Sequence, residues 1–188
     1  GSSGNVTISG GYVYAYSALG TAIGGGSSLS INGGSTNLKI SGGYIIAKSA
    51  TSVCIGGGTG GTKMISEGVW ASGGSATITI SGNPIIRTGS IGGGKTNNPN
   101  GRIGHATINI TGGDISAQFV MAGGAGAGNI SRFTMSGGTI SNSDVYSKEY
   151  YHVTNNGGAV YMEDGYFTMT GGTIRNCTSE VGGAVYIK

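Results

Sequence analysis

The sequence predicts an all-β protein, a single-stranded parallel β-helix (solenoid) of about six coils with three short strands per coil. Three observations predict it: a high glycine content, a repeated segment of alternating apolar and polar residues, and a glycine pair that ends each such segment. The chain has 188 residues and 42 glycines, about three times the ordinary usage. Because 37% of the residues are hydrophobic and only two are proline, glycine here indicates corners in an ordered β structure.

Each repeat is expected to hold two strands around a glycine corner and a third strand before a glycine block. The six copies are NVTISGGYVYAY (5–16), NLKISGGYIIAK (37–48), TITISGNPIIRT (77–88), TINITGGDISAQ (107–118), RFTMSGGTISNS (132–143) and YFTMTGGTIRNC (166–177). Alternation with period two is the pattern of a strand with one buried face. The third block recurs as AIGGG (22–26), CIGGG (54–58) and SIGGG (90–94).

Aligning the copies on their glycines places like residues in columns. The predicted inward columns are Val6, Leu38, Ile78, Ile108, Phe133 and Phe167; Ile8, Ile40, Ile80, Ile110, Met135 and Met169; and Val13, Ile45, Ile85, Ile115, Ile140 and Ile174. Stacked coils explain such columns, since each coil places the same position above the last. A β-propeller is the main alternative, but its blades need four antiparallel strands joined by hairpins.

Insertions follow the glycine block at 27–36, 59–75 and 95–105, and we expect them to project from one side. A further long segment, 143–156, precedes the glycine block of its copy. Because loops on rigid scaffolds commonly carry binding sites, the candidate ligand-binding residues are Trp70, Tyr150, Tyr151 and His152. Loops without any ligand are the alternative. The tyrosines at 12, 14, 16 and 44 either receive sugar rings or pack across strands.

The sequence predicts no enzyme, metal site or cofactor. Its seven carboxylates are scattered over different coils, whereas calcium sites and polysaccharide lyases need several together. No run of Lys or Arg indicates nucleic-acid binding, and no apolar run of 18 residues indicates membrane insertion. Cys54 and Cys177 fall four coils apart, roughly 19 Å at the usual strand spacing, which is too far for a disulfide. Cys54 aligns with Ala22 and Ser90, so we expect it to be a small buried residue.

The segment GGAVYMEDGYFTMTGGTIRNCTSEVGGAVYI (157–187) resembles the repeats of polymorphic outer-membrane proteins, with their GGA[IVL] motif at 157–160 and 182–185. The first two thirds are similar to glycine-rich repeats in large surface proteins of Gram-positive anaerobes. The resemblance implies a right-handed parallel β-helix in a secreted bacterial protein, at the cell surface or extracellular, with adhesin or structural roles and no catalytic residues.

We therefore expect a non-catalytic surface module over residues 1–188, one solenoid within a longer repeat array, acting as a structural rod or adhesin. Expected partners are other copies or neighbouring repeats at the open β-helix ends, which includes stacking into filaments, and surface glycans. A carbohydrate-binding module is the alternative function, and a polysaccharide lyase ranks third.

Overall fold

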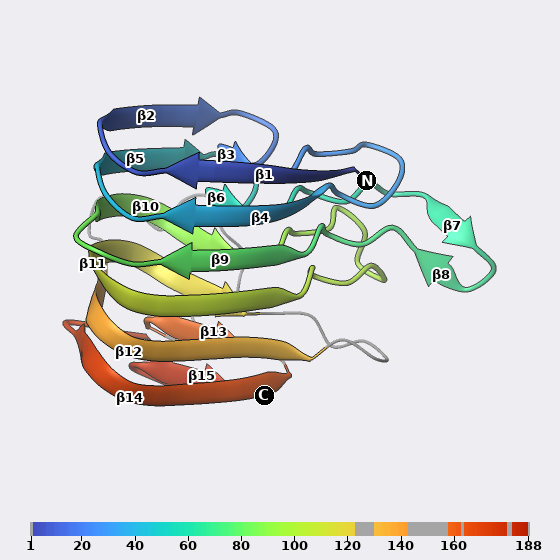
Figure 1. The fold of residues 1–188 in the computed structure, drawn as a ribbon. Coiled ribbons are helices and arrows are strands. Elements are labelled where there is room, and N and C mark those ends of the chain that lie inside the picture. Colours follow the sequence, from blue (N-terminus) through green and yellow to red (C-terminus); the bar gives the residue numbers. More distant parts are fainter. Residues whose placement is uncertain (1, 123–129, 143–157, 163, 180–181, 188) are drawn as a thin grey trace.

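The computed structural model describes residues 2–122, 130–142, 158–162, 164–179 and 182–187. These residues form an all-β structure without helices, in which 13 strands make one curled sheet and two strands make a separate hairpin (Figure 1). Every strand pair within the large sheet is parallel. The described residues contain no helix that could cross a membrane. The parallel pairing contradicts the β-propeller alternative, which requires antiparallel blades.

The strands of the large sheet lie in three stacks. The first stack holds β1 (Ser3–Ile8), β4 (Ser35–Ile40), β9 (Ala76–Ile80) and the starts of β11 (Ala106–Ala122), β12 (Ser131–Asn142) and β14 (Gly165–Arg175). The second stack holds β2 (Tyr12–Ser17), β5 (Tyr44–Ser49), β10 (Ile85–Gly92) and the later parts of β11, β12 and β14. The third stack holds β3 (Ile23–Gly24), β6 (Ile55–Gly56), the ends of β10 and β11, β13 (Val160–Met162) and β15 (Val185–Ile187).

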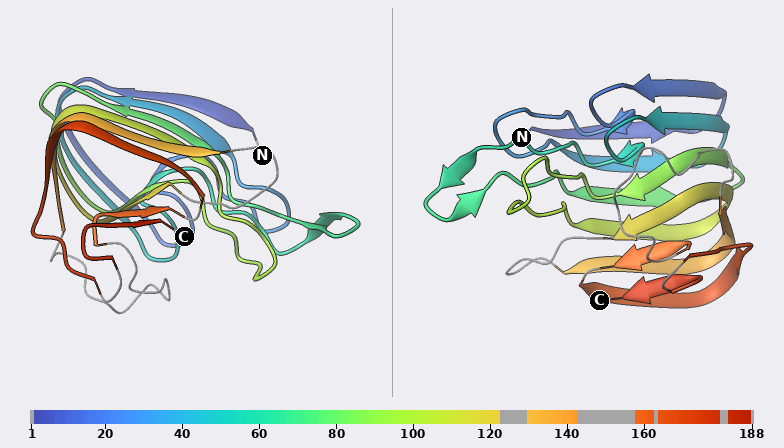
Figure 2. Two further views of the ribbon diagram at one scale, coloured as in Figure 1. Left: turned by 90° about the horizontal axis from the view of Figure 1, so that it is seen from below. Right: turned by 180° about the vertical axis from the view of Figure 1, so that it is seen from behind.

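The sheet curls so that the third stack returns to contact the first, with β3 lying against β1 and β4 (Figure 2). The core fills the space inside this curl. Its largest members are isoleucines from all three stacks, together with Leu38 and Phe133. Inward residues alternate with outward ones along β4 and β9, as a strand with one buried face requires.

The predicted residue columns of the first stack are confirmed. Val6 pairs in register with Leu38, and the same position continues through Ile78, Ile108, Phe133 and Phe167. The rings of Phe133 and Phe167 are stacked, with centroids 5.2 Å apart and an interplanar angle of 5°. Like side chains therefore lie above one another along the stack.

One member of the third predicted column is wrong. Ile86, not Ile85, pairs with Ile45 and Ile115 and is buried. Ile85 pairs instead with Tyr44 and is exposed. The cause is one additional residue at this corner, where Gly82-Asn83-Pro84 replaces the two glycines of other copies and moves the following strand by one position. A one-residue change of register exchanges the two faces of a strand.

The glycine blocks form a ladder that the sequence did not predict. Each glycine segment that follows a strand of the third stack lies beside a segment that leads into a strand of the first stack. Backbone amides of one segment donate to backbone carbonyls of the next, with N···O distances of 2.7–2.9 Å. These bonds run from Gly34 to Gly26, Gly58 to Gly34, Gly74 to Gly58, Gly94 to Gly74 and Gly104 to Gly94. At all of these positions except Gly26, a side chain would collide with the neighbouring backbone, which explains why glycine recurs here.

Candidate functional site

The three insertions after the glycine blocks lie against one another, which confirms that they occupy one side of the molecule. The backbone amide of Gly61 donates to the carbonyl of Ile31 at 2.9 Å, which joins the first insertion to the second. The amide of Asn97 donates to the carbonyl of Gly60 at 3.1 Å, and the Asn98 side chain donates to the carbonyl of Thr62 at 2.8 Å. These bonds join the second insertion to the third, so the loops form a layer of their own.

Trp70 lies in the hairpin that projects from this layer (Figure 1). The hairpin consists of β7 (Met64–Ser66) and β8 (Val69–Trp70), and Met64 pairs with Trp70 across it. Trp70 is half-buried, while Met64, Ile65 and Val69 beside it are exposed. The hairpin thus presents an apolar surface in which the indole is one part. The other predicted site residues, Tyr150, Tyr151 and His152, lie outside the described residues.

The tyrosines at 12, 14, 16 and 44 face outward from the second stack. Tyr12, Tyr14 and Tyr16 occupy successive outward positions of β2, and their side chains are 67%, 58% and 62% exposed. The rings of Tyr12 and Tyr44 are stacked, with centroids 5.8 Å apart, as the cross-strand packing alternative requires. The Lys48 ammonium lies 5.9 Å from the centroid of the Tyr14 ring, a cation–π distance. Binding of sugar rings to these tyrosines stays a prediction.

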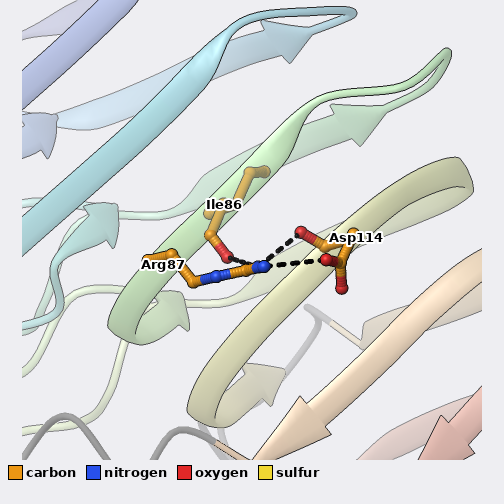
Figure 3. A network of polar contacts seen from close by, with 3 residues as sticks. All are labelled: Ile86, Arg87 and Asp114. Atoms are coloured by element: carbon orange, nitrogen blue, oxygen red, sulfur yellow. Dashed lines mark hydrogen bonds and ion pairs between the residues drawn. The ribbon is translucent and has the colours of Figure 1, made fainter.

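Asp114 forms an ion pair with Arg87 and belongs to no cluster of acidic side chains among the described residues. Its carboxylate accepts a hydrogen bond from the Arg87 guanidinium at 2.8 Å, and its backbone carbonyl accepts another at 3.2 Å (Figure 3). The same guanidinium donates to the carbonyl of Ile86 at 3.1 Å. This pair joins β10 to β11 on the outer surface, where an ion pair contributes about 0–1 kcal/mol. Within the described ranges, no three His, Cys, Asp or Glu side chains gather as metal ligands would.

The two cysteines are not joined in a disulfide, as predicted. Cys54 is buried in the core, and Cys177 is partly exposed near the other end of the stack. The predicted alignment of Cys54 is also confirmed, because the amide of Ala22 donates to its carbonyl and its own amide donates to the carbonyl of Ser90.

Lys95, at the start of the third insertion, was not identified from the sequence. Burial lowers the pKa of its ammonium to about 8, and the nearby Cys54 opposes that shift. Nothing in the local sequence distinguishes it from an exposed lysine, because its ammonium is brought near Cys54, a residue of another copy, only by the fold.

No family model matches this sequence, and the comparison with curated proteins and with solved structures yields no match either.

Proposed function

We propose that this chain is a non-catalytic module of the bacterial surface or extracellular space, in which the three stacks form a right-handed parallel β-helix of about six coils. Its role is that of a structural rod or adhesin. The observation that supports this proposal is the unbroken parallel register from Val6 to Phe167, with one residue from each repeat. Each added repeat lengthens such a rod by about 4.8 Å, so the fold is suited to spanning distance.

The proposed rod interacts with other copies or with neighbouring repeats through its edge strands. Among the described residues, β1, β2 and β3 each pair on a single side at one edge, and β14 and β15 do so at the other edge. Unpaired backbone groups on an edge strand recruit further strands. The exposed tyrosines of β2 lie beside one of these edges, which adds apolar surface to the contact.

Sedimentation velocity and electron microscopy test the self-association. We expect oligomers or filaments whose size grows with protein concentration, and their loss when Tyr14 and Tyr16 are both replaced by glutamate. Leu19→Glu is the matched control, because Leu19 is also exposed but lies outside the strands. A protein that remains monomeric at high concentration would refute self-association, whereas the rod itself is tested by the elongated dimensions that small-angle scattering measures.

A carbohydrate-binding module is the second candidate, supported by the three exposed tyrosines of β2 and by the projecting hairpin of Trp70. Aromatic rings offer apolar faces to sugars. A glycan array with the native chain, Trp70→Ala and the double variant Tyr150→Ala/Tyr151→Ala tests it. Signal lost in one variant assigns the site to that loop, and a blank array removes this candidate. A polysaccharide lyase ranks third, since Asp114 pairs with Arg87 and no three acidic side chains gather among the described residues.

A further inference from the structure

A cleft of about 350 Å³ lies on the outer face of the first stack, over the starts of β9, β11 and β12. Its main side chains are Ser75, Thr77, His105, Thr107, Ile130 and Arg132. The volume is near the lower end of the roughly 300–1,000 Å³ that ligand pockets span. The cleft is separate from the Trp70 hairpin and from the tyrosines of β2, because none of those residues lines it.

The register of the sheet explains the shape of this cleft. Thr77, Thr107, Arg132 and Tyr166 occupy one outward column, since each pairs with the next across β9, β11, β12 and β14. Two short threonines therefore stand beside a long arginine. Ser75, His105 and Ile130 precede these strands by one outward position and form the second side of the cleft.

Arg132 supplies a positive charge that is not neutralised by an ion pair among the described residues. Its guanidinium lies over the ring of Tyr166, 5.0 Å from the centroid. Stacking on an aromatic ring holds the plane of a guanidinium while leaving its N–H groups free to donate at the rim. A guanidinium positioned in this way suits a planar carboxylate, which it can bind through two parallel hydrogen bonds.

His105 supplies an unused hydrogen-bonding atom. Its Nδ1 is buried and has no hydrogen-bond partner within the described part of the chain. Burial, and then the charge of Arg102, lower the pKa of His105, while Asp164 opposes the shift. The imidazole is therefore neutral at pH 7 and offers one N–H donor and one nitrogen acceptor. Because Nδ1 is closed off from solvent, the ring nitrogen that remains for a ligand in the cleft is Nε2.

We propose that this cleft binds an acidic saccharide, with Arg132 pairing to the carboxylate of one sugar unit and His105, Thr77 and Thr107 bonding to its hydroxyls. The hydroxyl-bearing wall suits a polyhydroxylated ligand, and the exposed side chain of Ile130 offers an apolar surface to the C–H groups of a sugar ring. Nucleic acid is disfavoured, because the phenol ring of Tyr166, next to Arg132 in the outward column, already stacks on the Arg132 guanidinium. The proposal is independent of self-association at the sheet edges.

Isothermal titration calorimetry with two forms of one oligosaccharide tests the proposal. The first probe is tetragalacturonate, and the second is the same molecule after reduction of its carboxylates to CH₂OH groups. We expect saturable binding of the acidic form and at least roughly tenfold weaker binding of the reduced form, the difference expected for one charge-assisted contact. A glucuronate-containing hexasaccharide from hyaluronan is the second acidic probe, which covers a different sugar stereochemistry.

Three variants locate the binding. Arg132→Gln is expected to weaken binding of the acidic probe at least roughly tenfold, and because Arg132 is exposed the fold is retained. Lys39→Gln removes the same charge from the same outer face, outside the cleft, and is expected to bind as the native chain does. Trp70→Ala, which tests the loop site proposed above, is expected to leave this binding unchanged.

The proposal is overturned if neither acidic probe binds, or if the reduced oligosaccharide binds equally well. It is also overturned if Arg132→Gln and Lys39→Gln weaken binding to the same extent, because that result would indicate attraction by net charge alone. Binding that is lost in Trp70→Ala but kept in Arg132→Gln would place the saccharide on the hairpin instead.

Discussion

Replacing Gly56 by alanine tests whether close backbone packing at the glycine blocks holds the stacks together. Gly56 pairs with Gly24 on one side and with Gly92 on the other, in the third stack. Its φ is 144°, a conformation that residues with a side chain rarely adopt. A methyl group added to Gly56 would also overlap the backbone carbonyl of Gly92, which cannot rotate away as a side chain can. The substitution therefore has two independent costs.

The size of the loss follows from these two costs. Alanine in such a backbone conformation is strained by about 1–3 kcal/mol. Relieving the overlap moves the neighbouring coil and weakens two hydrogen bonds, Gly25 N–H to Gly56 O at 2.9 Å and Gly57 N–H to Gly92 O at 3.0 Å. Each such bond contributes about 0.5–1.5 kcal/mol. Alanine recovers about 0.4–1 kcal/mol by restricting the unfolded chain, which leaves a net loss on the order of 3 kcal/mol.

Urea unfolding of Gly56→Ala and of the matched control Gly26→Ala measures this loss. Gly26 belongs to the same kind of glycine block, but a methyl group there has no heavy atom within 4 Å and its φ is not positive. We expect the midpoint of Gly56→Ala to fall well below that of the native chain, and the control to change by less than about 1 kcal/mol. Equal unfolding free energies for the two variants would refute the argument that close packing requires glycine at position 56.

Three further predictions concern the interior. Because the folded pKa of Lys95 is about 8 and its ordinary value is 10.5, the unfolded chain binds more protons between these values, so the free energy of unfolding rises with pH there. The rise is at most about 3 kcal/mol, and urea titrations of Lys95→Met should lack it; equal profiles would contradict the shift. Phe133→Ala removes a fully buried ring and should cost about 3–5 kcal/mol in the same assay, whereas a loss below about 1 kcal/mol would contradict its burial. A thiol reagent should label Cys177 in the native chain and Cys54 only after unfolding, and equal rates would contradict the burial of Cys54.

The repeat alone was sufficient to predict the parallel pairing and most of the register. Alternation with period two specifies which residues face inward, and a glycine pair marks the same corner in each copy. The alignment of Val6 with Leu38 is confirmed for this reason. The predicted alignment is wrong at Ile85, because two adjacent isoleucines fit the inward position equally well and the additional corner residue decides between them. The alternation of apolar and polar residues does not distinguish Ile85 from Ile86, because that choice depends on the geometry of the corner.

The candidate sites were harder to predict, because they depend on the sizes of side chains that the stack brings together. His105 and Arg132 belong to different copies, and each is unremarkable within its own segment. Only the register places both beside the short Thr77 and Thr107, so that a cleft opens between them. Trp70 could be identified because it is the only tryptophan, but its place in an antiparallel hairpin depends on contacts within a single insertion.

The division between inward and outward columns indicates how binding can evolve on this sheet. The inward column at Leu38 stays apolar in every copy, whereas the outward column beside it contains Asn5, Asn37, Thr77, Thr107, Arg132 and Tyr166. Outward residues do not take part in the core packing, so their replacement leaves the core intact. Each copy thus contributes one exchangeable side chain to a shared surface. A ligand that lay across several strands of the stack would contact residues distant in sequence, and the specificity of such a site could change while the fold is retained.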